Sequence, residues 1–254
     1  MTGKALRNRP LTDLAEALLC QWRDNGRRWE KVATQARVLG LEVWNPALYA
    51  LGVYQAYLSK FPPKRGALLA LGLNPGPYGM AQTGIPFTDC RTARRDLGLI
   101  IDIPGEAPPD LISRLKKENG KWKATYERSS LGIYQFLYKA WGNLQAAYEN
   151  WFVGNPCPLL FLDPAAWNVT PADPRLKRIP EVATLRQMAV TRFSHVLKAR
   201  GIICLGADVA KAVGNTAEQL VGPDQVIYYE HPARAVPTQW AEGLVQELTR
   251  RRLL

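Results

Sequence analysis

Short apolar runs alternate with amphipathic segments along most of this chain, and that order of elements constrains its fold more than any other feature. The runs with the length and composition of buried strands are residues 67–73, 151–153, 201–206 and 225–230, with a further apolar segment at 158–162. The segments with helical spacing are residues 11–22, 46–58, 91–99, 130–148, 180–200, 207–220 and 238–252. Strands that alternate with helices predict an α/β fold, in which a parallel sheet is covered by helices on both faces.

The length of 254 residues is sufficient for one α/β domain with a full core. We therefore predict a single domain over residues 1–254, with residues 1–40 as an N-terminal helical extension packed on it. No apolar run approaches the roughly 20 residues of a membrane helix, and acidic residues interrupt the first helical segment, unlike the core of a signal peptide. We expect an intracellular, monomeric protein with no membrane partner.

The charge balance favours a polyanionic partner. Lys and Arg number 33 against 22 Asp and Glu, a formal charge of +11. Because Lys and Arg contacts to phosphates supply most non-specific affinity for nucleic acids, DNA or RNA is the leading partner class, although solubility alone could also explain a basic surface. Residues 113–128 are locally basic; we interpret them as a solvated connection, with DNA contact as the alternative.

The residues that usually hold metals are few and scattered. The 4 cysteines are Cys20, Cys90, Cys157 and Cys204, far apart and without a Cys-x-x-Cys pair, and the chain has only 2 histidines. This pattern argues against a zinc site or an iron–sulfur cluster and favours reduced thiols. Residues 201–206 also lack a Gly-x-Gly-x-x-Gly fingerprint. We expect no metal and no cofactor.

Residues 72–87 form a loop rich in Gly and Pro directly after the first predicted strand. Pro75 and Pro77 fix the backbone dihedral φ, while the glycines allow other groups to approach the backbone closely. The loop presents few polar side chains, notably Asn74 and Gln82. An elaborate turn is the alternative interpretation, but the length of the loop and its position after a strand favour a functional site.

Three polar residues follow the ends of predicted strands: Asn74, Asn155 and His231. Ligands of parallel α/β sheets bind beyond the carboxyl ends of the strands, so these side chains can share one crevice. Such a site lacks a carboxylate base, a nucleophile and a phosphate loop. Asparagine amides suit the edge of a planar heterocycle, histidine can stabilise a developing negative charge, and Phe87 can stack on a ring.

These residues carry a resemblance to a known family. Residues 72–87, the segment Asn155-x-Cys-Pro-Leu-Leu-Phe-Leu with the later Asn168-Val-Thr-Pro, and His231-Pro resemble the single-strand-selective monofunctional uracil-DNA glycosylases. The likeness extends more loosely from residues 43–46 to the final helix. It implies a uracil-DNA glycosylase-like, three-layer α/β/α fold with a central four-stranded parallel sheet, and excision of a flipped-out base from DNA.

The resemblance also implies roles for individual residues. Asn74 orients the attacking water, and His231 hydrogen-bonds uracil O2 as the glycosidic bond breaks. Asn155 binds the uracil edge and discriminates against cytosine. The remaining base contacts are Leu73, Gly76, Met80 and Phe87, with Phe87 stacking and Gly76 leaving room for substituents at C5, as in 5-hydroxymethyluracil. Because the motifs contain no lysine to form a Schiff base, the expected product is an intact abasic site.

The chain departs from the family after His231, where residues 233–237 are shorter and less rich in proline than the usual DNA-wedging loop. Arg234 is our candidate for the wedge, and Lys211, near the start of a helix, is a candidate for phosphate contact. Asp163 could suggest a general base, but we assign it to loop capping. Two alternatives remain: a non-catalytic sensor of damaged DNA, and a glycosylase of deaminated purines such as xanthine or hypoxanthine.

Overall fold

A computed structural model of the chain describes residues 10–99, 117–118, 121–122 and 127–254. Most of the basic segment predicted over residues 113–128 lies outside the described residues. Among those described, no helix combines the length and apolar character needed to cross a membrane.

The central sheet has four parallel strands in the order β5-β2-β8-β9. Its strands are β2 (Leu68–Leu71), β5 (Trp151–Gly154), β8 (Ile202–Leu205) and β9 (Val226–Tyr229). Every residue of β2, β5 and β8 is buried, as expected for a parallel sheet covered on both faces. Each strand falls within, or within one residue of, a run predicted from the sequence.

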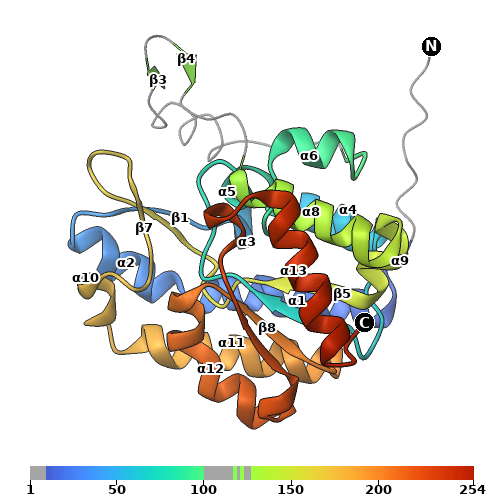
Figure 1. The fold of residues 1–254 in the computed structure, drawn as a ribbon. Coiled ribbons are helices and arrows are strands. Elements are labelled where there is room, and N and C mark those ends of the chain that lie inside the picture. Colours follow the sequence, from blue (N-terminus) through green and yellow to red (C-terminus); the bar gives the residue numbers. More distant parts are fainter. Residues whose placement is uncertain (1–9, 100–116, 119–120, 123–126) are drawn as a thin grey trace.

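Helices cover both faces of this sheet (Figure 1). On one face lie α11 (Glu181–Leu197) and α12 (Ala207–Val221), and on the other α8 (Arg128–Trp141) and α13 (Pro237–Arg250). Successive residues of β5 show the two faces: Trp151 packs on Phe136 of α8 with ring centroids 4.8 Å apart, and Phe152 packs on Phe193 of α11 at 5.7 Å. The predicted three-layer α/β/α fold with a four-stranded parallel sheet is confirmed.

The first helix is part of the main core. Helix α1 (Asp13–Arg28) begins at Thr12, whose hydroxyl accepts from the Ala15 amide, and it buries Leu18 and Trp22 against the elements of the sheet domain. It packs on α11 and on α3 (Pro46–Tyr49) and α4 (Leu51–Lys60). The helix extends past residue 22, the end predicted from the sequence, to Arg28, and Gly26 in this extension fits closely against Ala47 of α3.

A second, smaller sheet did not follow from the sequence pattern. It is antiparallel, with the order β1-β6-β7, and its strands are β1 (Glu42–Trp44), β6 (Leu160–Leu162) and β7 (Asn168–Val169). Together with α2 (Glu30–Val38) and α10 (Pro174–Lys177), it encloses a satellite apolar cluster. These strands have two or three residues each, which is too short to show a two-residue period in the sequence.

The helix predicted over residues 130–148 is two helices. Gly142, with φ at 76°, ends α8 in the left-handed conformation, and the Asn143 side chain caps α9 (Leu144–Asn150) by accepting from the Ala146 amide. The remaining short elements are α5 (Met80–Thr83), α6 (Cys90–Arg95), the 3₁₀ turns η1 (Pro223–Gln225) and η2 (Pro232–Arg234), and the hairpin of β3 (Lys117–Glu118) and β4 (Lys121–Trp122).

Candidate active site

A cavity of about 300 Å³ opens at the carboxyl ends of the parallel strands. Eight of the nine residues predicted for the site line it: Leu73, Asn74, Gly76, Met80, Phe87, Asn155, His231 and Arg234. The lining residues that were not assigned to the site are Glu127, Asn168, Thr170, Leu205, Gly206, Ala207, Asp208 and Val209. The structure therefore brings segments that are far apart in the sequence into one wall.

The loop after β2 is anchored by the segment after β5. The Asn74 Nδ2 donates to the carbonyl oxygens of Pro75 and Leu159, both at 3.3 Å, and the Cys157 amide donates to the Leu73 carbonyl at 3.3 Å. Because Nδ2 is engaged with the backbone, the Asn74 carboxamide is held in one orientation. Its oxygen is the atom left to accept a hydrogen bond in the cavity.

Asn155 is buried, with 3% of its surface exposed, yet half of its carboxamide is unpaired. The Nδ2 contacts Met80 Sδ at 3.0 Å, whereas Oδ1 has no hydrogen-bond partner among the described residues. Gly72 makes this position possible, because a Cβ there would clash with Asn155 Oδ1 and lie 2.9 Å from Phe87 Cζ. A buried carbonyl without a donor is costly, so Oδ1 is suited to accept an N–H from a ligand.

His231 follows β9 and lies beside Phe87, the last residue of the Gly-Pro loop. Its Nδ1 accepts from the Ala233 amide at 3.3 Å, so the neutral ring carries its proton on Nε2. Burial, followed by the positive charge of Arg234, lowers the pKa of His231 below its ordinary value. The imidazole is thus a neutral Nε2–H donor at neutral pH.

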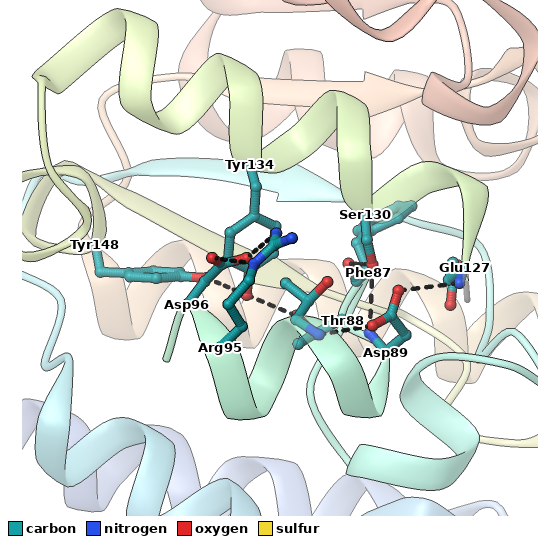
Figure 2. Close-up of polar contacts among 10 residues, drawn as sticks. Phe87, Thr88, Asp89, Arg95, Asp96, Glu127, Ser130, Tyr134 and Tyr148 are labelled. Carbon is teal, nitrogen blue, oxygen red and sulfur yellow. Dashed lines mark hydrogen bonds and ion pairs between the residues drawn. The ribbon is translucent and has the colours of Figure 1, made fainter. Parts of the chain in front are cut away.

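Phe87 is held in an unusual backbone conformation by the start of α8. Its φ is 51°, in the left-handed region that favours glycine, and only 7% of the residue is exposed. Figure 2 shows how Ser130 clamps it: Ser130 Oγ donates to the Phe87 carbonyl at 2.6 Å and accepts from the Asp89 amide at 3.3 Å. The ring lies beside His231, with centroids 5.9 Å apart.

Glu127 brings a carboxyl group into a site that we expected to lack one. Its Oε1 accepts from the Ser129 hydroxyl at 3.1 Å. Its backbone amide donates to Asp89 Oδ2 at 3.1 Å (Figure 2). Burial raises the pKa of Glu127 to about 7, with a further rise from Asp89, while the Ser129 hydroxyl and the Met80 backbone partly offset it. The expectation of a site without a carboxylate was wrong because the loop motifs give no sign of a residue that α8 delivers.

The start of α12 forms another wall that we did not predict. Gly206, with φ at 106°, ends β8 beside His231, and the first residues of α12 line the cavity. The position of Gly206 between a predicted buried strand and a predicted helix is the feature of the sequence that could have indicated this wall. The positive end of the helix dipole there favours negative charge, although Asp208 in the first turn opposes it.

The other predicted residues lie as follows. Arg234 is exposed at the cavity, whereas Lys211 is exposed on α12 and does not line it. Asp163 caps its loop, as predicted: Oδ1 accepts from the amides of Ala165 and Trp167, both at 2.9 Å. No cluster of His, Cys, Asp and Glu capable of holding a metal occurs in the described part of the chain.

The chemistry of the cavity suits a planar heterocycle. An aromatic ring, a buried amide acceptor and a neutral imidazole donor converge on a space of limited size, and a fixed amide oxygen lies beside them. Stacking on Phe87 would orient such a ligand, and the two polar groups would read its N–H and C=O edges.

Comparisons with known proteins agree with this geometry. No protein-family model matches the chain. A single-strand selective monofunctional uracil-DNA glycosylase of Rattus norvegicus is 30% identical over 198 residues, which are 77% of this chain and 69% of that protein. The Mus musculus enzyme is 29% identical over 194 residues (75% and 67%), and the Bos taurus enzyme 29% over 198 residues (77% and 71%).

A solved structure shares the fold. The crystal structure of wild-type Pedobacter heparinus SMUG2 superposes with a TM-score of 0.64 at 20% identity, covering 84% of this chain and 89% of that one.

Proposed function

This chain belongs to the single-strand selective monofunctional uracil-DNA glycosylase family, and from that premise we propose that it excises uracil and 5-substituted uracils from DNA by hydrolysis of the N-glycosidic bond. The base flips out of the DNA, enters the cavity described above and leaves an intact abasic site.

The observation that carries this proposal is the unpaired, buried Oδ1 of Asn155. Uracil offers an N3–H to this acceptor, whereas cytosine has a lone pair at N3. A cytosine in the same place would leave two acceptors facing each other without a proton, and a site that reads a hydrogen bond rejects the base that lacks it. Asn155 therefore selects uracil over cytosine.

His231 stabilises the leaving group. When the C1′–N1 bond breaks, the pair of electrons moves onto the base and the negative charge is shared with O2. The Nε2–H of a neutral imidazole, fixed because Nδ1 is occupied by the Ala233 amide, is placed to donate to that oxygen. Such an interaction strengthens as charge develops, which is the condition for lowering the barrier.

Asn74 places the nucleophile. Its carboxamide nitrogen is tied to the Pro75 and Leu159 carbonyls, so its oxygen orients a water molecule toward C1′. The sugar already bears positive charge as the base departs, so this water needs positioning more than deprotonation. Phe87 stacks on the base, and the backbone near Leu73 and Met80 completes the pocket.

The family resemblance assigns the proposed tolerance of 5-substituted uracils to Gly76, which lines the cavity without a side chain and packs against the Glu127 carboxyl group. Outside the pocket, Arg234 is exposed beside His231 and is proposed to contact DNA next to the flipped base. Lys211, exposed on α12, is proposed to contact a phosphate.

The activity is tested on single- and double-stranded oligonucleotides that carry uracil, 5-hydroxymethyluracil, xanthine or hypoxanthine, followed by alkaline cleavage of abasic sites. We expect strand breaks with the two uracils. Breaks with the purines alone would favour the purine alternative, and no breaks with any base would leave a non-catalytic sensor as the better description.

The roles of two residues are tested by Asn74→Ala and His231→Ala. Each should lower the single-turnover rate on uracil by about a hundredfold or more, because one loses the oriented water and the other the donor to O2. DNA affinity, measured by fluorescence anisotropy, should change by less than about threefold. A variant with the wild-type rate would refute its assigned role.

A further inference from the structure

Asn155 can discriminate between two pyrimidines only if its carboxamide keeps one orientation. Uracil presents an N3–H donor and an O4 acceptor, whereas cytosine presents an N3 acceptor and an amino donor at C4. A carboxamide has an acceptor end and a donor end of nearly the same shape. Rotated by half a turn, the same side chain would match cytosine, so the group that fixes this rotation also fixes the choice of base.

Met80 contacts the donor end of the carboxamide. The Asn155 Nδ2 donates to Met80 Sδ at 3.0 Å, and within the described part of the chain this is the only hydrogen bond that the carboxamide makes. A thioether sulfur is an acceptor with no hydrogen to donate. The amide nitrogen therefore gains a hydrogen bond beside Met80, whereas the amide oxygen in the same place would face the lone pairs of the sulfur.

The acceptor end of the carboxamide has no comparable partner. Asn155 Oδ1 lies against Gly72 and accepts no hydrogen bond from the residues that the structure describes. The backbone amide of Gly72 is already used, because it donates to the Gly154 carbonyl at 3.1 Å. The preference of the free protein for one rotation of the carboxamide therefore comes from the sulfur.

The Met80 side chain is fixed in this position. Only 1% of the residue is exposed, and it belongs to the main apolar core. Met80 begins α5, where its carbonyl accepts from the Gly84 amide at 2.7 Å and the next carbonyl, that of Ala81, accepts from the Tyr49 hydroxyl. A buried side chain on a backbone held in this way keeps its sulfur beside Asn155.

On the basis of the proposed function, we propose that Met80 is a positioning residue that sets the choice of uracil over cytosine. Its sulfur holds Nδ2 of Asn155, so that Oδ1 is presented to N3–H and the second hydrogen of Nδ2 is available to O4. This task differs from the base contact that the family resemblance implies for Met80, because the thioether acts through Asn155.

Met80→Leu tests the proposal, because it removes the sulfur at nearly constant side-chain volume, a change that protein cores tolerate. Single-turnover excision of uracil and of cytosine is measured in the same single strand. The ratio of the uracil rate to the cytosine rate should fall by about three- to tenfold, the equivalent of one hydrogen bond, and the cytosine rate should rise. Met188→Leu, the same exchange at a half-buried position of α11, should keep the wild-type ratio.

A second measurement does not depend on cytosine as a leaving group. Free uracil and free cytosine compete with the DNA substrate, and the ratio of their inhibition constants reports recognition of the base alone. In Met80→Leu this ratio should shift toward cytosine by the same factor. Protein in which norleucine replaces methionine throughout exchanges sulfur for a methylene group in a side chain of the same shape. It should show the same shift, and it replaces Met80→Leu if that variant does not fold.

Wild-type ratios in the protein without the sulfur would overturn the proposal. A uracil rate that falls while the ratio of inhibition constants stays constant would also overturn it, since Met80 would then have a merely structural role. In both cases the wild type still excises uracil, so the proposed function stands. A wild type that excises no uracil would remove the proposed function first, and this inference with it.

Discussion

Gly72 lets two residues of the cavity wall, Asn155 and Phe87, take their positions. Asn155 Oδ1 and the Phe87 ring occupy the space that a Cβ on Gly72 would need. Gly72 lies just after β2, where pairing with β5 continues as the Gly72 amide donates to the Gly154 carbonyl at 3.1 Å. A side chain at this position would displace the Asn155 oxygen or the Phe87 ring. The absence of one methyl group at Gly72 therefore fixes the positions of two side chains on the cavity wall.

Gly72→Ala should therefore lower uracil excision by at least about tenfold, because the added methyl group displaces the Asn155 oxygen or the Phe87 ring, and small misplacements in a site are costly. The matched control is Gly52→Ala in α4, where a Cβ meets no atom within 4 Å. The control should keep full activity and gain up to about 1 kcal/mol of stability. Equal rates for the two variants would contradict this account.

Glu127 also predicts how stability depends on pH. Its pKa is raised in the folded state to about 7 from 4.5, so the folded protein binds more protons between these values. The resulting contribution of Glu127 to the free energy of unfolding is fully present below pH 4.5. As the pH rises through 7, this contribution falls by on the order of 1 to 3 kcal/mol.

Glu127→Gln should remove this loss. Urea unfolding at pH 5 and pH 8 measures the free energy of unfolding of the variant and of the wild type. The difference, variant minus wild type, should increase by on the order of 1 to 3 kcal/mol from pH 5 to pH 8. Glu242→Gln, whose side chain is exposed, serves as the control. A constant difference between Glu127→Gln and the wild type would show that the carboxyl group is ionised throughout.

Among the elements, the start of α8 contributes most to the geometry of the site. Three residues there contribute: Glu127 lines the cavity wall, the Ser129 hydroxyl donates to the Glu127 carboxyl group, and the Ser130 hydroxyl donates to the Phe87 carbonyl. The helix is rigid because its other face packs on β5 and α13 through Phe136. A helix that is part of the core thereby positions the Phe87 ring on the cavity wall.

Ser130→Ala tests this clamp. The substitution leaves the Phe87 carbonyl and the Asp89 amide unpaired in a buried place, at a cost of about 1 to 3 kcal/mol in the free energy of unfolding. Because φ of Phe87 is positive, the ring should relax and uracil excision should fall as well. Thr249→Ala, an exposed hydroxyl on α13, should change neither quantity. Unchanged stability in Ser130→Ala would show that the clamp is not needed.

At the scale of the whole molecule, the chain has a formal charge of +11 and a cavity at one edge of its parallel sheet. A net positive protein attracts DNA without regard to sequence and releases counterions when it binds. Under the proposed function, selection of the base is the task of the cavity. Affinity for the strand and selection of the base are therefore separable properties.

Arg234→Ala should weaken binding to single-stranded DNA and reduce the slope of log Kd against log salt by about 0.7, the value for one phosphate contact on a single strand. Fluorescence anisotropy between 50 and 200 mM salt, roughly the range in which such slopes are resolved, measures it. Arg37→Ala, an exposed arginine at the end of α2, is the charge-matched control. Identical slopes for the two variants would place Arg234 away from the DNA.

The sequence alone was sufficient to predict the parallel sheet and the helical layers on its two faces. It also identified the three polar residues that follow the strands. The reason is local: buried parallel strands are continuous apolar runs, and the carboxyl ends of such strands meet at one edge, so Asn74, Asn155 and His231 had to lie near one another. The Gly-Pro loop could also be recognised from the sequence, because proline restricts the backbone dihedral φ and glycine permits conformations that other residues avoid.

Only the tertiary structure placed Glu127, the start of α12 and the antiparallel sheet. Glu127 lies outside every periodic segment and reaches the cavity because α8 packs on β5 and Asp89 holds its amide. Contacts between distant parts of the chain bury Asn155 Oδ1 without a hydrogen-bond partner. Such contacts also bury Glu127, and this burial raises its pKa. A sequence pattern reports which faces are buried, whereas desolvation and hydrogen bonding depend on which groups meet there.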